Sequence, residues 1–165
     1  TGSRVDDLFL VNRGGQMFEW LTTGDLWNRD CLKLAPHVTL PFKAMDDRSW
    51  LAIYGAVDPT ERDGVNFEHD IRPMLRDFGK CVSTLDPNHL IAAHRTLLRH
   101  GGLQTATPST GFLAVKAYLT QSRDEDRIEL YGFGFAGWDG HDWDAEKQWV
   151  NAQQARGKLT LIPVL

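Results

Sequence analysis

The sequence predicts an α/β fold with a mainly parallel sheet flanked by helices. Short apolar stretches with strand character alternate along the chain with longer segments whose apolar residues recur at helical spacing. Glycine-rich or polar turns separate the two kinds of segment. A length of 165 residues suits one domain of ordinary size, so we expect a single domain over 1–165.

The first half of the chain predicts strands and helices in alternation. Strands are predicted at 7–12, 37–40 and 50–54. A helix is expected to begin near Met17 and to close near Gly24. Residues 67–78 are expected to be only partly helical, because Pro73 lacks the backbone donor that a helix interior needs.

The second half has stronger helix signals. Asp86 followed by Pro87 is typical of a helix start, since aspartate caps well and proline fits the first helical position. Helices are predicted from Pro87 to the stop at Gly101-Gly102, from about 109 to 120 and from about 144 to 156. The helix over 109–120 is apolar on most sides and should be buried. Strands are predicted at 127–131 and 159–162.

Composition excludes several classes of protein. The 6 Trp, 8 Phe and 3 Tyr argue against disorder, and a net charge of -4 with scattered basic residues argues against nucleic-acid binding.

No stretch is long enough to span a bilayer, and no signal peptide opens the chain, so a cytoplasmic location is predicted. Cys31 and Cys81 have no metal-ligand spacing; two free thiols are expected, and one disulfide stays open.

Pro108-Ser109-Thr110-Gly111 stands at the predicted start of the helix over 109–120. Unpaired backbone N–H groups and the helix dipole at such a start attract phosphate or carboxylate. Gly111 would also let a ligand approach the backbone closely. An ordinary cap at Ser109 is the simpler interpretation of the tetrapeptide by itself.

His141 lies in a loop rich in glycine and aspartate, just before the last predicted helix. An accessible imidazole can accept a proton near neutral pH, as a general base must, and Glu146 could orient it or support the loop. A surface histidine beside acids that complement the helix dipole is the simpler alternative. A further alternative is a metal site formed by Asp139, His141, Asp142 and Asp144. That spacing matches neither an HExxH motif nor an EF-hand loop.

Asn12 and the two tryptophans beside His141 each allow two interpretations. Asn12 closes the first predicted strand, where its amide could bond a ligand phosphate or base, or could simply tolerate the dihedral angles of a turn. Trp138 and Trp143 flank His141 and could form a platform for a sugar or cover the core. The sequence has no P-loop or GxSxG motif, which argues against common NTPases and α/β-hydrolases.

Together these segments resemble the eukaryotic-type sialyltransferases, glycosyltransferase family 29. Pro108-Ser109-Thr110-Gly111, the helix after it and Glu129-Leu130-Tyr131-Gly132-Phe133-Gly134 resemble that family's small sialylmotif. His141-x-x-x-x-Glu146 resembles its very small motif, and the segment from Val5 to Arg13 is similar to the end of its large motif. The resemblance covers most of the chain weakly and is most specific from Pro108 to Ile162.

The resemblance implies a Rossmann-like three-layer fold, a GT-A-like variant, that transfers sialic acid or a related acidic sugar. The donor would be a CMP-sugar and the acceptor a glycan hydroxyl, and the inverting reaction would need no metal or other cofactor. On this model His141 is the general base and Glu146 a second catalytic residue. The donor would be bound by Asn12, Ser109, Thr110 and Gly111.

Departures from the family pattern keep other hypotheses open. The large motif normally begins with a strand and a Gly-Asn turn that cradle the nucleotide, and this chain starts after that point, so the expected domain lacks that strand. Cys31 and Cys81 do not match the family's cysteine pair, which suits a cytoplasmic bacterial-type relative. The Golgi lumen is the alternative location for a fragment of a membrane-anchored enzyme. Alternative functions are a non-catalytic nucleotide- or glycan-binding domain and a metal-dependent hydrolase.

Overall fold

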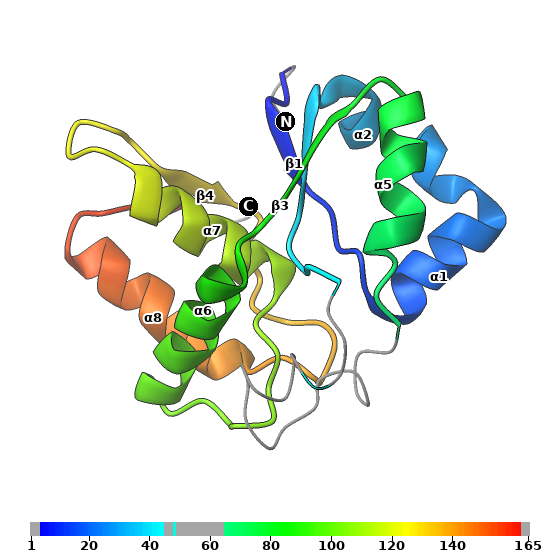
Figure 1. The fold of residues 1–165 in the computed structure, drawn as a ribbon. Helices are drawn as coiled ribbons and strands as arrows, with labels where there is room; N and C mark the ends of the chain where they lie inside the picture. The colour runs from blue at the N-terminus through cyan, green and yellow to red at the C-terminus, as the bar shows by residue number, and fades with distance from the viewer. Residues whose placement is uncertain (1–3, 45–47, 49–64, 163–165) are drawn as a thin grey trace. The chain divides into compact units, whose positions relative to one another are not determined.

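The structure is a computed structural model that describes residues 4–44, 48 and 65–162. The chain divides into two compact units, 1–90 and 91–165. Each unit holds a small parallel sheet flanked by helices (Figure 1), which confirms the α/β class. The single domain over 1–165 stays a prediction.

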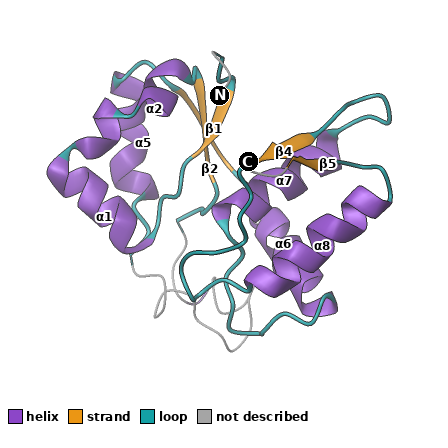
Figure 2. Ribbon diagram, turned by 180° about the vertical axis from the view of Figure 1, so that it is seen from behind, coloured by secondary structure: helices purple, strands orange, loops and turns teal. Residues whose placement is uncertain are grey.

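The first unit contains a three-stranded parallel sheet in the order β1-β2-β3. Its strands are β1 (Asp7–Phe9), β2 (His37–Leu40) and β3 (Cys81–Thr84). Its described helices are α1 (Gly14–Thr23), the 3-10 helix η1 (Asp25–Asn28), α2 (Asp30–Leu34) and α5 (Glu68–Asp77). Figures 1 and 2 both show α1 and α5 on the same side of the sheet.

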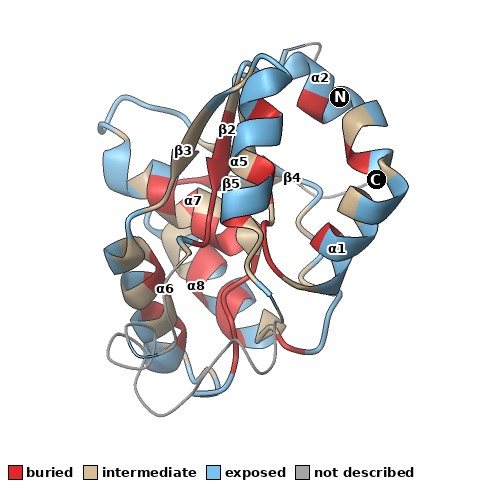
Figure 3. Ribbon diagram, turned by 45° about the vertical axis from the view of Figure 1, so that its right-hand side comes forward, coloured by how far each residue is buried: buried red, intermediate tan, exposed pale blue. Residues whose placement is uncertain are grey.

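One face of this sheet packs on the helices and forms the core of the first unit. The core cluster joins apolar residues of the strands to those of the helices: Leu10, Met17, Leu26, Leu32, Val38, Leu40, Ile71 and Leu75. Figure 3 shows this burial along β2 and on the inner sides of the helices. Side chains alternate along a strand, so the opposite face carries Asp7, Thr39 and Ser83, which are joined by hydrogen bonds.

Most of the predicted boundaries in the first unit are close to the observed ones. The strand at 37–40 and the helix ending at Gly24 are confirmed, and Gly24 has the left-handed φ of 74° that suits a helix end. β1 is shorter than predicted, and β3 was not predicted at all. The predicted strand at 50–54 lies outside the described residues.

Pro73 does not interrupt α5, which continues from Glu68 to Asp77. The expectation of a partly helical segment was therefore wrong. Proline removes one hydrogen bond of the helix, but Ile71 and Leu75 on either side of it are fully buried in the core. Their burial, worth roughly 2 kcal/mol for each side chain, offsets the lost bond.

The second unit contains the two-stranded parallel sheet of β4 (Glu129–Tyr131) and β5 (Thr160–Ile162). Its helices are α6 (Pro87–Arg99), which begins before the boundary between the units, α7 (Thr110–Gln121) and α8 (Trp143–Ala155). All five elements were predicted within a few residues of their observed ends. Figure 2 shows α7 and α8 close to the sheet.

The expectation that the helix over 109–120 is buried is confirmed. Four residues of α7 are buried: Phe112, Leu113, Val115 and Ala117. The ring of Phe112 meets Trp149 of α8 edge-on, with 4.9 Å between ring centroids, a favoured aromatic geometry. No helix in the described part of the chain has both the length and the apolar character needed to cross a membrane.

Candidate functional site

The starts of α7 and α8 are joined by a buried hydrogen-bonded pair, Ser109 and Glu146. Ser109 is the N-cap of α7, where its hydroxyl oxygen accepts a bond from the backbone N–H of Phe112 at 3.0 Å. The same hydroxyl donates to Glu146 Oε2 at 2.7 Å, and the Ser109 backbone N–H donates to Oε1 at 2.7 Å. One carboxylate thus ties the first turn of α8 to the cap of α7.

Burial controls the charge of Glu146, which is only 2% exposed. Removal from water raises the pKa of this carboxyl to about 7, although the two hydrogen bonds from Ser109 lower it, and the charge of Asp142 raises it further. At neutral pH the protonated and ionised forms of Glu146 are therefore both populated.

His141 is oriented by one backbone hydrogen bond and two aromatic rings. Its Nδ1 lies 2.7 Å from the carbonyl oxygen of Thr107. A carbonyl oxygen only accepts, so Nδ1 carries the proton and the lone pair of the neutral ring is on Nε2. Trp138 and Trp143 each meet the imidazole edge-on at 4.9 Å between centroids. Both tryptophans that flank His141 in the sequence therefore also contact its ring in the structure.

Gly111 and Ser109 both have close partners within the protein. A Cβ added to Gly111 would lie 3.4 Å from the ring of Phe133, so this ring is close to the first turn of α7. The backbone N–H and the hydroxyl of Ser109 are both bonded to Glu146. Thr110 is the first residue of α7 and is partly buried. The simpler interpretation of Ser109, a helix cap, is therefore confirmed.

One aspartate of the His141 loop, Asp142, also has structural partners. Asp142 is the N-cap of α8: Oδ1 accepts from the N–H of Ala145 at 3.0 Å, and Oδ2 accepts from the N–H of Leu103 at 2.9 Å. Within the described ranges, no group of three or more His, Cys, Asp or Glu side chains could hold a metal ion.

Asn12 belongs to the first unit, where it is fully buried after β1. Its amide nitrogen donates to the carbonyl oxygen of Phe42 at 2.6 Å and to Asn66 Oδ1 at 3.0 Å, and its Oδ1 accepts from the N–H of Phe42 at 3.0 Å. These bonds hold the segment after β2 against the segment after β1. Each polar atom of the Asn12 side chain thus has a partner within the chain.

Sequence reasoning missed a second polar cluster, centred on Glu68 in α5. Its Oε1 accepts from Arg72 at 2.5 Å and from Thr84 at 2.7 Å, and its Oε2 accepts from the N–H of Ala44 at 2.5 Å. Arg72 also contacts Thr84 and donates to the carbonyl oxygen of Val82 at 3.2 Å. The i, i+4 spacing of Glu68 and Arg72 was the signal that could have indicated it.

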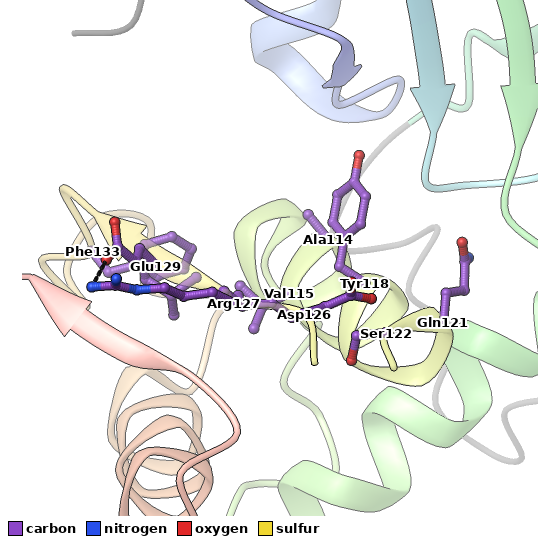
Figure 4. Close-up of a pocket in the computed structure, with 11 residues that line it drawn as sticks. Ala114, Val115, Tyr118, Gln121, Ser122, Asp126, Arg127, Glu129 and Phe133 are labelled. Carbon is purple, nitrogen blue, oxygen red and sulfur yellow. Dashed lines mark ion pairs between the residues drawn. The ribbon is translucent and has the colours of Figure 1, made fainter. Parts of the chain in front are cut away.

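A groove of about 630 Å³ lies within the second unit, between α7 and the strand β4 (Figure 4). Its apolar wall includes Val115 and Tyr118 of α7 and Leu130 of β4. Arg127 and Glu129 lie at its edge and form an ion pair of 2.6 Å. The groove therefore combines an apolar wall with a locally neutralised pair of charges.

Comparison with known proteins gives one informative relative. The chain is similar to the urease operon 23 kDa accessory protein of Rhizobium meliloti (strain 1021), at 25% identity over 165 residues. The alignment covers 96% of this chain and 74% of the relative. No family model matches the sequence, and no solved structure matches it significantly.

This relative overturns the resemblance to the sialyltransferases. It is named as an accessory protein of a urease operon and is similar over nearly the whole chain. The predicted transfer of sialic acid, the classification as a glycosyltransferase, the CMP-sugar donor and the glycan acceptor were therefore wrong, as was the alternative of a nucleotide- or glycan-binding domain derived from that family. The physical reason is that short helix caps and glycine turns, which carried the resemblance, occur in unrelated folds.

The comparisons do not test individual residues. The expected absence of a cofactor and the cytoplasmic location also stay predictions. The catalytic roles of His141 and Glu146 stay predictions, as do the roles in ligand contact of Asn12, Ser109, Thr110 and Gly111. The chain is similar to a urease accessory protein across both of its compact units.

Proposed function

We propose that this protein is a non-catalytic accessory protein that supports urease. The observation that carries the proposal is the similarity to the urease operon accessory protein, which extends over 96% of the chain. A similarity confined to one motif would suit a shared helix cap or turn. A similarity of this extent suits a shared fold and a related task.

The site geometry supports a binding role more than a catalytic one. Glu146 is almost fully buried and Ser109 is bonded to it, so both hold the structure together. Large apolar side chains are exposed instead, and a protein partner could cover them. The most exposed are Phe18 (59%), Tyr131 (65%), Leu103 (66%) and Val65 (67%).

The finer fold assignment is part of this proposal. We infer a Rossmann-like three-layer fold, in which helices cover a mainly parallel sheet. The parallel pairing of every described strand and the helices between successive strands support it.

Complementation of the relative tests the proposed function. The gene for the 23 kDa accessory protein would be deleted in Rhizobium meliloti, and this chain would be supplied in its place. We expect urease activity, measured as ammonia release, to recover well above the strain with empty vector. We also expect an affinity-tagged chain to retain urease or another product of the operon.

Two neighbouring residues on α1 provide a matched pair of variants. Phe18→Ser removes an exposed aromatic side chain, whereas Glu19→Ser changes an exposed polar neighbour. If a partner covers α1, Phe18→Ser should lower retention about tenfold, typical of an aromatic contact residue, and Glu19→Ser should not. A stably folded chain that neither restores activity nor retains any product of the operon would overturn the proposal.

A further inference from the structure

Three residues with complementary chemistry form a row across the sheet of the first unit. Asp7, His37 and Cys81 are the first residues of β1, β2 and β3. The parallel register pairs Asp7 with His37 and His37 with Cys81. Side chains in register on neighbouring strands lie on the same face of a sheet, with strands about 4.8 Å apart. His37 therefore stands between a carboxylate and a thiol.

The histidine of this row is held by its carboxylate neighbour. His37 Nδ1 lies 3.0 Å from Asp7 Oδ1. The carboxylate is itself held in place, because the Thr39 hydroxyl lies 3.1 Å from both of its oxygens and 3.1 Å from the Ser83 hydroxyl. An ionised carboxylate only accepts, so Nδ1 of His37 carries a proton and Nε2 holds the lone pair of the neutral ring.

β2, which carries His37, is the central strand of the sheet, between β1 and β3. Cys81 on β3 and Asp7 on β1 therefore lie on opposite sides of His37. It is a free thiol and is exposed. The second cysteine, Cys31, is also free and exposed, but it lies on α2 and not in the sheet. The chain thus contains an internal reference for the reactivity of an exposed thiol.

We propose that Cys81 is a reactive thiol that undergoes exchange with disulfides, with His37 as its proton acceptor and Asp7 as the positioning residue. A nucleophile, a base and a group that orients the base are the parts that such activation needs. This role is independent of the proposed support of urease. It assigns a modification site to the face of the sheet opposite the core cluster.

The exchange step conserves atoms and charge. His37 Nε2 takes the thiol proton, and Asp7 stabilises the imidazolium that forms. The Cys81 thiolate attacks one sulfur of a low-molecular-weight disulfide, so a new S–S bond forms and the old one breaks. The departing thiolate receives the proton from His37. The products are a mixed disulfide on Cys81 and one free thiol.

Single-cysteine variants test this proposal. Cys31→Ser leaves Cys81, and Cys81→Ser leaves Cys31, so each thiol is followed alone. The probe is dithiodipyridine, an uncharged disulfide whose product is followed by its absorbance, with EDTA present. At neutral pH we expect Cys81 to react about tenfold faster than Cys31, because a neighbouring base increases the reactive thiolate. In urea the two thiols should react at similar rates.

Variants of His37 and Asp7 distinguish activation of Cys81 by these two residues from an effect of its exposure alone. His37→Gln in the Cys31→Ser protein should lower the rate of Cys81 to about that of Cys31, and Asp7→Asn should give an intermediate rate. The excess of the Cys81 rate over the Cys31 rate, measured along a pH series, should vanish in the His37 variant. Circular dichroism checks folding. Equal rates for the two thiols, or a Cys81 rate that His37→Gln leaves unchanged, would overturn the proposal.

Discussion

Two buried glutamates, one in each unit, carry opposite shifts in pKa. Glu68 is 7% exposed and Glu146 is 2% exposed. Burial raises the pKa of Glu68, but the hydrogen bonds from Ala44, Thr84 and Arg72 and the Arg72 charge outweigh it, so the pKa lies below its ordinary value. Burial raises the pKa of Glu146 to about 7 in spite of the bonds from Ser109.

The difference teaches that the partners of a buried carboxyl determine its charge. Glu68 pairs with a guanidinium, whereas the bonds to Glu146 come from a neutral hydroxyl and a backbone amide. A cation compensates the loss of water around a carboxylate better than neutral donors do. Glu68 in the first unit is therefore buried as a carboxylate ion, whereas Glu146 in the second unit is buried and titrates near neutral pH.

Removing the cation from the first unit should have the largest effect. Arg72→Ala leaves the Glu68 carboxylate buried without its opposite charge, and we expect the free energy of unfolding to fall by about 3 kcal/mol. Hydrogen exchange, resolved to α5 and β3, measures the loss in this unit. Arg72→Lys keeps the charge and should lose less. A loss for Arg72→Ala below about 1 kcal/mol would show that the ion pair does not stabilise the unit.

The second largest effect is expected in the pH dependence of the stability of the second unit. The folded pKa of Glu146, about 7, lies above the ordinary value of 4.5, so the folded state binds the proton more tightly than the unfolded state. Its stabilising contribution is therefore fully present below the ordinary value and is lost as pH rises through 7. Between mildly acidic and mildly alkaline pH this loss amounts to about 2 kcal/mol.

Glu146→Gln removes this titration and keeps the shape of the side chain. The difference in unfolding free energy between the wild type and this variant should change by about 2 kcal/mol between mildly acidic and mildly alkaline pH, in favour of the variant at high pH. Urea denaturation along a pH series measures it. A difference that stays constant with pH would contradict the raised pKa. Glu68→Gln should show no such change over this range, because the pKa of Glu68 is lowered and its stabilising contribution is lost only as pH falls below the ordinary value of 4.5.

The smallest effect is expected from Ser109→Ala. The change removes the cap of α7 and one bond to Glu146, and it should cost about 1 kcal/mol. It should also raise the pKa of Glu146 further, because that bond favours the ionised form. Carboxyl titration by NMR measures the shift. The matched control is Ser122→Ala at the other end of α7, which should leave the titration of Glu146 unaltered.

Local signals in the sequence predicted most of the elements. Ser109 and Asp142 cap the helices that follow them, and Gly24 ends α1. These signals succeed because a cap or a helix stop depends on residues within one turn of the chain. β3 was missed because its four residues include a cysteine and a serine, which give no strand signal, and pairing with β2 stabilises it.

The predicted functional site was less accessible to such reasoning. The sequence predicted ligand contact for Ser109 and catalysis for His141 and Glu146, and it did not indicate which groups within the chain these residues bond. The structure shows Ser109 bonded to Glu146, and His141 held by the carbonyl oxygen of Thr107. A polar residue at a helix start looks alike in sequence whether its partner is a ligand or a distant side chain.

By itself, the sequence determined the alternation of strands and helices and the caps that delimit them, because these follow from the periodicity and chemistry of neighbouring residues. The tertiary structure alone decided that Glu146 meets Ser109, which is 37 positions away, and that Asp7, His37 and Cys81 share one row. Burial and charge pairing depend on side chains that only folding brings together, so the local sequence does not indicate which residues will be buried or paired.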